Sequence, residues 1–361
     1  NDKGEIMTTA SLKTQNLIRA LKLIRNQEGM TRQKLADSLQ ISMPTALNIV
    51  EELRSRHLVE EAGESESTGG RKAKTLRLNP GSGFSIGIQV VRAYIKIVIT
   101  DIYGEVLFYK RCDYPYRDEP AWYRKMGAAL IDVIDESGID GRKITGVGIS
   151  FPGIIDQERN ILIHSHVFGL YNMDLDRFYK SIAYPLCIIN DANSACLAER
   201  NPDLETYLYI SLNETVGGSL VVNRNMYIGR HWQAGAVGHM ILHPNGKKCY
   251  CGKKGCADAY LNTYVLTRGK MDYSKYFQLL ESGDKDAVKR FDKYIDDLAI
   301  LISNLRMLLD MPIVLGGDLG SWLTPYIERI CEETQKYDLF SRDVDYIDVC
   351  RCRDHKFAKG A

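Results

Sequence analysis

The sequence predicts a protein of the α/β class, in which a small helical module with a β-hairpin precedes two larger α/β lobes. Three observations support this prediction. Apolar residues recur at helical spacing over 14–57, strand-like and helical segments alternate twice over 84–317, and 361 residues exceed what one ordinary core holds. We therefore expect three domains, at residues 1–80, 81–195 and 196–361.

The composition indicates a globular protein. Hydrophobic residues make up 45% of the chain and charged residues 26%, and no apolar run is long enough to cross a membrane or to serve as a secretory signal. We therefore expect a cytoplasmic protein without a membrane partner. The nine cysteines are then expected to be thiols or metal ligands, because disulfides are disfavoured in that compartment.

Positive charge is concentrated near the N-terminal end. The net charge is +1, yet residues 10–80 contain 12 Lys and Arg against 8 Asp and Glu. A small basic module is compatible with binding to the DNA backbone, although this excess alone does not establish it.

Residues 14–57 have the pattern of a helix-turn-helix. An amphipathic helix over 14–27 is followed by two helices that begin at the N-cap residues Thr31 and Ser42. Pro44 stands in the first turn of the last helix, where its missing N–H costs nothing. The residues expected to face inward are Leu35, Ala36, Leu39, Ala46, Ile49, Val50 and Leu53.

The last of these helices is expected to enter the major groove of double-stranded operator DNA with its N-terminal turns. Its candidate DNA-binding residues are Ser42, Met43, Thr45 and Asn48. Strand-like pieces at 58–59 and 75–78 flank a Gly-Gly-Arg-Lys segment, which predicts a β-hairpin wing. Its basic tip, Arg71 and Lys72, is suited to phosphates or the minor groove.

A plain three-helix bundle is the alternative for the helices alone, and the wing favours DNA binding over it. Glu60, Glu61, Glu64 and Glu66 on the first half of the wing count against DNA binding, unless they form a solvated face of the hairpin.

The most specific chemical motif lies in the middle of the chain. Cys249, Cys251 and Cys256 stand in a Gly- and Lys-rich loop that follows His239. Three thiolates and an imidazole form a set that Zn²⁺ binds tetrahedrally, and a complete set leaves no place for a catalytic water. We therefore predict a structural zinc ion on these four residues. Three core thiols with an incidental histidine are the alternative.

The rest of the chain repeats one arrangement of strands and helices. Strand-like runs over 84–109 precede a helix near 119–137, and similar runs over 205–231 precede a helix near 284–309. A further short strand follows each helix. Because a β-meander followed by a helix occurs twice, we expect two α/β lobes with a cleft between them.

Several motifs, in order, resemble the ROK family (repressor, open reading frame, kinase), and in particular its repressors of the xylose-repressor and N-acetylglucosamine-repressor type. These motifs are the Cys and His set, Gly146–Gly153, Asn190–Asn193 with Ala198–Glu199, and Val314–Gly317. The resemblance implies a two-lobed, actin-like sugar-kinase fold behind a winged helix-turn-helix. It also implies that the C-terminal segment completes the first lobe and that the protein is a homodimer or tetramer.

Departures from the family's kinases imply that this chain is not an enzyme. Similar kinases have a carboxylate and small residues in the first phosphate turn, where this chain has Gln89, Val91 and Arg92. Their second, glycine-rich turn contains Glu214 here. Bulky side chains keep backbone N–H groups from a phosphate, and a carboxylate repels it. Since phosphoryl transfer depends on such positioning, no kinase activity is expected.

The family's sugar cleft is better matched. Asn190, Asp191, His239 and Asp258 stand where similar proteins bind a sugar, and Asp191 is expected only to accept hydrogen bonds. The resemblance implies one His239 ring nitrogen on zinc and the other toward the sugar. Similar proteins have a glutamate at each of two positions where this chain has Ala236 and the shorter Asp258. These differences imply either a larger, less acidic pocket or a vestigial one.

Ser165 and His166 lie where the family often has a sugar-contacting asparagine. They are expected either to supply hydrogen-bond donors to the ligand or to be surface residues of a loop.

Together these features predict a repressor of carbohydrate-utilisation genes that binds operator DNA and is controlled by a small carbohydrate effector. A regulator controlled by a protein partner, with a vestigial sugar cleft, is one alternative. An active sugar kinase with an appended regulatory domain is the other.

Overall fold

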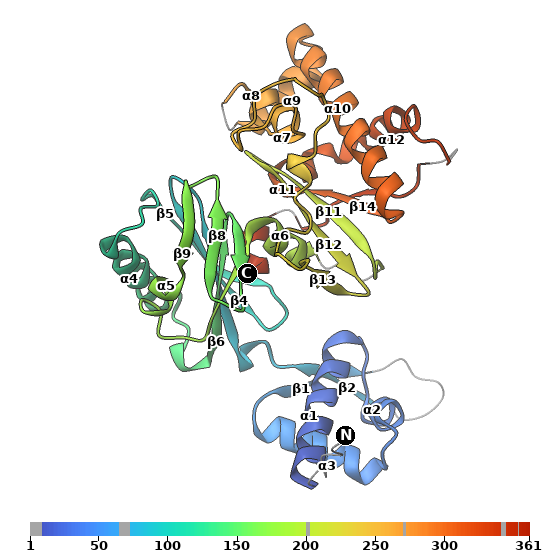
Figure 1. The fold of residues 1–361 in the computed structure, drawn as a ribbon. Helices are drawn as coiled ribbons and strands as arrows, with labels where there is room; N and C mark the ends of the chain where they lie inside the picture. The colour runs from blue at the N-terminus through green and yellow to red at the C-terminus, as the bar shows by residue number, and fades with distance from the viewer. Residues whose placement is uncertain (1–8, 65–72, 200–202, 270–271, 341–343, 353) are drawn as a thin grey trace, which may run out of the picture. The chain divides into compact units, whose positions relative to one another are not determined.

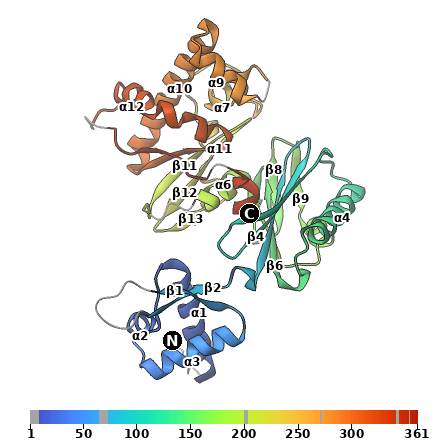
Figure 2. The same ribbon diagram turned by 180° about the vertical axis from the view of Figure 1, so that it is seen from behind.

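The computed structural model describes residues 9–64, 73–199, 203–269, 272–340, 344–352 and 354–361 (Figures 1 and 2). Contacts within the chain divide it into two compact units. The described part of the first unit falls within residues 1–85, 100–107 and 140–145, and the second unit comprises the rest.

The first unit is built around three helices and a hairpin. The elements are α1 (Thr9–Asn26), α2 (Arg32–Leu39), α3 (Met43–Ser55), β1 (Val59–Glu64) and β2 (Lys74–Leu78). The hairpin strands pair antiparallel, with Val59 opposite Leu78. The side chains of Thr31 and Ser42 accept hydrogen bonds from backbone N–H groups in the first turns of α2 and α3, at 3.2 and 3.4 Å. Both predicted helix caps are therefore present.

The core of this unit joins the inward faces of the helices to the hairpin. All seven residues that the sequence places inward are buried, and Leu35 and Leu53 have only 0% and 1% of their surface exposed. Leu17 of α1 and Leu76 of β2 belong to the same cluster. Because these side chains come from the helices and the hairpin alike, the elements stabilise one another.

Two five-stranded sheets with the same strand arrangement follow the hairpin. Their orders are β10-β6-β3-β4-β5 and β15-β14-β11-β12-β13. In each sheet three strands consecutive in sequence are neighbours, and two later strands extend the sheet on one side. The strand pairs β10/β6 and β15/β14 are both parallel. This repeat confirms the prediction of two α/β lobes.

The first sheet comprises β3 (Phe84–Val90), β4 (Ile95–Asp101), β5 (Val106–Cys112), β6 (Ile144–Phe151) and β10 (Leu186–Asn190). The second comprises β11 (Tyr207–Leu212), β12 (Val216–Val222), β13 (Asn225–Tyr227), β14 (Ile313–Gly316) and β15 (Ile347–Val349). A small antiparallel sheet contains β7 (Ile154–Asp156), β8 (Ile161–Ser165) and β9 (Leu170–Asp174).

The helices of this part include the two long ones that the periodicity predicts, α4 (Pro120–Ser137) and α10 (Lys285–Leu309). The others are α5 (Asp176–Tyr179), α6 (Asp191–Glu199), α7 (Asp258–Leu261), α8 (Tyr264–Thr267), α9 (Tyr273–Glu281), α11 (Gly317–Gly320), α12 (Ile327–Gln335) and α13 (Lys356–Gly360). The domain boundary expected between residues 195 and 196 falls inside α6. In the described part of the chain, no helix combines the length and apolar character that a membrane crossing requires.

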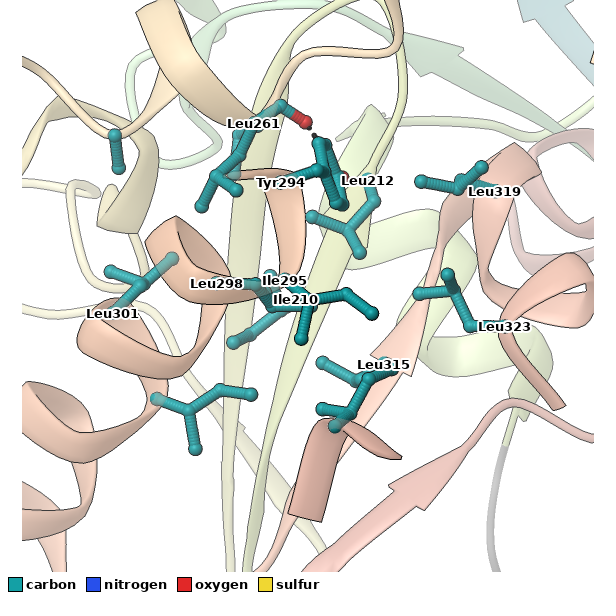
Figure 3. Packing of buried hydrophobic residues seen from close by; sticks show 14 of the residues in the cluster. Ile210, Leu212, Leu261, Tyr294, Ile295, Leu298, Leu301, Leu315, Leu319 and Leu323 are labelled. Atoms are coloured by element: carbon teal, nitrogen blue, oxygen red, sulfur yellow. Dashed lines mark hydrogen bonds between the residues drawn. The ribbon is translucent and has the colours of Figure 1, made fainter. Parts of the chain in front are cut away.

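The helix α10 packs on the second sheet (Figure 3). Tyr294 and Leu298 of α10 and Ile210 and Leu315 of the sheet are fully buried in one cluster. The Tyr294 hydroxyl donates to the backbone oxygen of Leu261 at 2.9 Å. Its only polar side-chain atom therefore has a partner inside the core.

The helix α13 and the residue after it, Ala361, fit against two glycines of the first sheet. A Cβ atom on Gly87 of β3 would lie 1.7 Å from Ala358 O, and one on Gly148 of β6 would lie 2.0 Å from Ala361 O. A side chain at either position would therefore displace the C-terminal segment.

A buried ammonium group connects α13 to the other lobe. Only 2% of Lys356 is exposed, and its Nζ donates to the backbone oxygen of Gly317, which follows β14, at 2.7 Å. In addition, the Ser194 hydroxyl of α6 donates to Phe357 O. The helix α13 thus contacts elements of both lobes.

We predict that Leu35→Ala destabilises the first unit by about 2–5 kcal/mol, because it removes a fully buried side chain and leaves a cavity. Ile18→Ala, at a position 48% exposed on α1, is the matched control and should cost less than about 1 kcal/mol. Urea unfolding followed by circular dichroism measures both. Equal losses from the two variants would contradict the assigned core.

Candidate functional site

Four side chains of the second unit come together as a candidate metal site. One ligand atom from each of His239, Cys249, Cys251 and Cys256 lies within 4.8 Å of the other three. Cys249 Sγ is 3.9 Å from His239 Nδ1, and the Sγ atoms of Cys251 and Cys256 are 3.7 Å apart. Thiolates bound tetrahedrally at about 2.3 Å from Zn²⁺ lie about 3.8 Å from one another. The donor set and its spacing therefore fit a metal ion of this kind.

Backbone geometry shapes the loop that carries the three thiols. Cys249 N donates to Lys253 O at 2.8 Å and closes a turn. Gly255 has φ +83°, and a Cβ atom there would lie 1.9 Å from His243 O, so only glycine fits this close approach. The loop therefore folds back on itself and brings its thiols to one point.

The fourth candidate ligand, His239, ends a short 3₁₀ helix (Val237–His239). Burial and the nearby Lys253 ammonium lower the pKa of His239 below its ordinary value. The imidazole is therefore neutral near pH 7, which is the form that binds metals. Since Nδ1 is the ring nitrogen next to the thiol of Cys249, Nε2 is left for a second partner.

Two adjoining cavities lie next to this cluster. The smaller has a volume of about 160 Å³ and is lined by Asn190, Asp191 and His239. The larger has a volume of about 360 Å³ and is lined by Asp191 and Asp258. The predicted ligand-binding residues are thus close together, but Asp258 lies on the larger cavity and only Asp191 lies on both.

The amide group of Asn190 is used inside the protein. Its Nδ2 donates to Gly153 O at 2.9 Å and to Asp191 Oδ1 at 3.0 Å, and its Oδ1 accepts from Asn193 N at 3.1 Å. Burial raises the pKa of Asp191, although backbone N–H groups and Asn190 oppose this effect. Asn190 therefore fixes the carboxyl group of Asp191 at the junction of the cavities.

The carboxyl group of Asp258 holds neighbouring groups in place. Asp258 is 2% exposed and accepts hydrogen bonds from Val216 N at 2.7 Å and from the Tyr250 hydroxyl at 3.3 Å. Burial raises the pKa of Asp258 to about 6, and these donors limit the shift. Its position thereby couples the start of β12 to the cysteine loop.

Tyr250 was not among the predicted site residues, yet it lines both cavities. The available signal was its place between two cysteines of the metal motif. Of the two residues for which donor and loop-surface roles were left open, Ser165 is fully buried and accepts from Phe168 N at 3.3 Å. Ser165 lines only the smaller cavity, whereas His166 is exposed and lines both cavities.

The residues that replace the kinase phosphate turns face the larger cavity. Gln89, Arg92 and Glu214 line it, together with Asp318. The Arg92 guanidinium donates to the backbone oxygen of Val167 at 2.6 Å and is thereby tied to the loop after β8. Carboxylates therefore border the space in which a kinase of this family would need groups that attract phosphate.

The outer face at the start of α3 is accessible. Ser42, Thr45 and Asn48 are exposed, and Met43 is half-buried. The hydroxyl oxygens of Ser42 and Thr45 are 2.8 Å apart, so each fixes the other. Ser42, Thr45 and Asn48 therefore lie away from the buried residues of α3, and their contact with the major groove stays a prediction.

The predicted wing tip, Arg71 and Lys72, lies outside the described residues. On the strands of the hairpin, Glu61 pairs with Lys74 at 2.5 Å and with Arg32 at 2.7 Å. Hydrogen bonds from Lys74 and Arg32 lower the pKa of Glu61 to about 2. Lys74 and Arg32 therefore balance the charge of this carboxylate within its own unit. Glu61 then contributes less repulsion toward the DNA backbone.

A family model described as "ROK family" matches residues 85–361. The chain belongs to the ROK family. This membership agrees with the two repeated lobes, the candidate metal cluster and the adjoining cavities, and it confirms the family predicted from the sequence motifs.

Relatives of this ROK chain include named regulators. It is 27% identical over 300 residues to the xylose repressor of Bacillus spizizenii, covering 79% of this chain and 77% of that protein. It is 24% identical over 386 residues to the DNA-binding transcriptional dual regulator NagC of Escherichia coli K12, covering 99% of this chain and 94% of that protein.

Solved structures establish the fold. A ROK family transcriptional regulator, a homologue of the E. coli MLC protein, has a TM-score of 0.77 at 22% identity and covers 97% of this chain and 94% of that one. A ROK family glucokinase from Streptomyces griseus has a TM-score of 0.66 at 19% identity and covers 77% of this chain and 97% of that one. The predicted winged-helix and two-lobed fold class is thereby confirmed.

We predict that Cys256→Ser removes most of the bound metal, because the hydroxyl is a poorer ligand than the thiolate that it replaces. Cys187→Ser is the matched control, since Cys187 is exposed and outside the cluster. Plasma mass spectrometry of the purified proteins should give about one metal ion per chain for the wild type and the control. Full occupancy in Cys256→Ser would argue against the assigned ligand set.

Proposed function

We propose that this ROK protein is a repressor of carbohydrate-utilisation genes that binds operator DNA and responds to a saccharide. The observation that carries the proposal is that one chain contains both a winged-helix unit and a ROK domain. In that domain Arg92 and Glu214 line the larger cavity. Relatives named as a xylose repressor, matched over 79% of this chain, and as NagC, matched over 99%, support a DNA-binding regulator. No kinase activity is expected, since Glu214 repels a phosphate.

The proposed DNA-binding surface combines the start of α3 with the wing. Its residues are Ser42, Met43, Thr45 and Asn48 for base edges, and Arg71 and Lys72 for the DNA backbone. Exposed hydroxyl and amide groups at the N-terminal end of a recognition helix are suited to reading bases, whereas lysine and arginine contact phosphates.

The proposed metal is a structural zinc ion held by His239, Cys249, Cys251 and Cys256. Four protein ligands leave no position for a reactive water, so the ion would serve to hold the loop and to fix the His239 tautomer. Nε2 of His239 would then be a hydrogen-bond donor to the ligand.

The proposed effector site lies in the two cavities, with Asn190, Asp191, His239 and Asp258 as the predicted ligand-binding set. A cytoplasmic homodimer or tetramer would present two winged helices to a palindromic operator. Binding that favours one arrangement of the lobes would alter the spacing of those helices. A coupling free energy of about 1–3 kcal/mol changes operator affinity roughly 5–150-fold.

A regulator controlled by a protein partner is the second candidate. Ala236, which replaces a glutamate found in similar proteins, lines the smaller cavity, and the Asn190 amide is occupied internally. Both observations reduce the number of groups that can bind a sugar. Operator binding without stabilisation by any saccharide would favour this candidate.

For DNA binding, we predict that Asn48→Ala weakens binding to the preferred operator about 5–150-fold, because one base contact contributes about 1–3 kcal/mol of discrimination. The operator is first selected from random duplexes with the wild-type protein, and fluorescence anisotropy then gives each affinity. Asn225→Ala, at an exposed position of β13, should bind like the wild type. Unchanged affinity and sequence preference in Asn48→Ala would remove this residue from the proposed surface.

For the effector, we predict that Asp191→Asn abolishes the rise in melting temperature that a bound saccharide causes, because the carboxylate borders both cavities. Asp132→Asn, at an exposed position of α4, should respond like the wild type. Operator affinity without saccharide should be the same in both variants. A full thermal response in Asp191→Asn would place the effector elsewhere.

A further inference from the structure

We propose that the effector is an uncharged saccharide of at least two rings, one ring in the smaller cavity and the next in the larger cavity, against Tyr250 and Tyr264. This inference rests on the proposed function, because it specifies the ligand class of the same site. It assigns to the larger cavity a binding role in place of the phosphate role that it has in kinases.

The volumes and the shared walls favour a ligand that spans both cavities. The smaller cavity, at about 160 Å³, lies below the range of about 300–1,000 Å³ that is usual for small-molecule sites, whereas the larger, at about 360 Å³, lies within it. Asp191, His166 and Tyr250 line both cavities. The two cavities therefore share a wall, and a molecule seated beside His239 borders the larger cavity.

The charges of the larger cavity oppose a phosphorylated ligand. Among the described residues that line it, Asp191, Glu214, Asp258 and Asp318 carry carboxyl groups, and Arg92 is the one arginine or lysine. One of the Arg92 nitrogens already donates to Val167 O. Hydroxyl groups can donate to carboxylates, whereas the negative charge of a phosphate is repelled by them.

Two tyrosine rings supply the apolar surface that a sugar ring requires. Tyr250 is 50% exposed and Tyr264 is 38% exposed, although both line the cavity. Such rings can pack against the C–H groups of a pyranose while carboxylates accept from its hydroxyls. Burial and the adjacent Glu214 carboxylate raise the pKa of Tyr264 to about 12, so its hydroxyl remains a donor at neutral pH.

The metal loop fixes the first of these rings. Tyr250 lies between two candidate zinc ligands, and its hydroxyl donates to Asp258 at 3.3 Å. The rings of His166 and His239 each approach it to 5.5 Å between centroids. Tyr250 is thereby held at the junction of the two cavities, where it can contact both rings of a disaccharide.

The test is isothermal titration calorimetry of the full-length, zinc-containing protein with matched ligands. The probes are xylose and xylobiose, glucose with cellobiose and maltose, N-acetylglucosamine with chitobiose, and the 6-phosphates of glucose and N-acetylglucosamine. We expect at least one disaccharide to bind tenfold or more tightly than its monosaccharide, and the 6-phosphates to bind more weakly than the free sugars.

Variants of Tyr264 test the role of the larger cavity. Tyr264→Ala should weaken disaccharide binding roughly tenfold and leave monosaccharide binding within about twofold, since only the second ring loses its partner. Tyr264→Phe keeps the ring and should retain most of the affinity. Tyr227→Ala, 54% exposed on β13, is the control. Zinc content and circular dichroism confirm that each variant folds.

Several outcomes would overturn the proposal. These are a monosaccharide or a sugar phosphate that binds as tightly as every disaccharide, or a Tyr264→Ala variant that loses both ligand sizes equally. If the protein binds only monosaccharides, this inference is wrong while the proposed function stands. Failure of every saccharide to bind would overturn this inference together with the saccharide-responsive part of the proposed function, while operator binding would still support a DNA-binding regulator.

Discussion

Convergence of three thiols and one imidazole on a single point is the constraint on which the cleft depends. The loop around Cys249 is short and glycine-containing, and its backbone turns allow its thiols to reach His239. Because Tyr250 is part of that loop and hydrogen-bonds Asp258, the same closure places an aromatic ring at the junction of the cavities and a carboxyl group on the larger one. The geometry of the candidate metal cluster and that of the cavity junction are therefore set by the same loop.

The chain shares the fold of a ROK family glucokinase but has different side chains at the turns next to the larger cavity. Both sheets retain the same strand arrangement, and the cavities between their loops persist. What differs is the chemistry of a few side chains, such as Arg92 and Glu214, at the turns that border the larger cavity. A regulator needs the two lobes to respond to a bound molecule, and it does not need to align a phosphate for transfer.

The parts of the fold set by local chemistry were predictable from the sequence. Thr31 and Ser42 cap the helices that their side chains predict, and the buried face of α3 follows the helical period of its apolar residues. The four candidate metal ligands were predictable because their residue types and spacing are unusual. Their convergence within 4.8 Å agrees with that prediction.

The parts set by packing between distant segments were not predictable. The sequence groups Asp258 with Asn190, but in the structure Asp258 lines the larger cavity and Asn190 lines the smaller one. Ser165 is a polar residue at the end of β8, and the sequence gives no sign that it is fully buried. Tyr250 gained its importance only once the loop was folded, since a tyrosine between two cysteines has no distinctive pattern of its own.

The close approach of α13 to Gly87 and Gly148 has an evolutionary consequence. Neither glycine leaves room for a methyl group against the C-terminal segment. The same segment contacts Gly317 of the other lobe through Lys356. Selection on a lobe-to-lobe response would therefore act jointly on positions in β3, β6 and α13 that are remote in sequence. Family members in which α13 packs differently should differ at these glycines and in α13 together. A substitution at one glycine alone would displace the C-terminal segment and would be removed by selection.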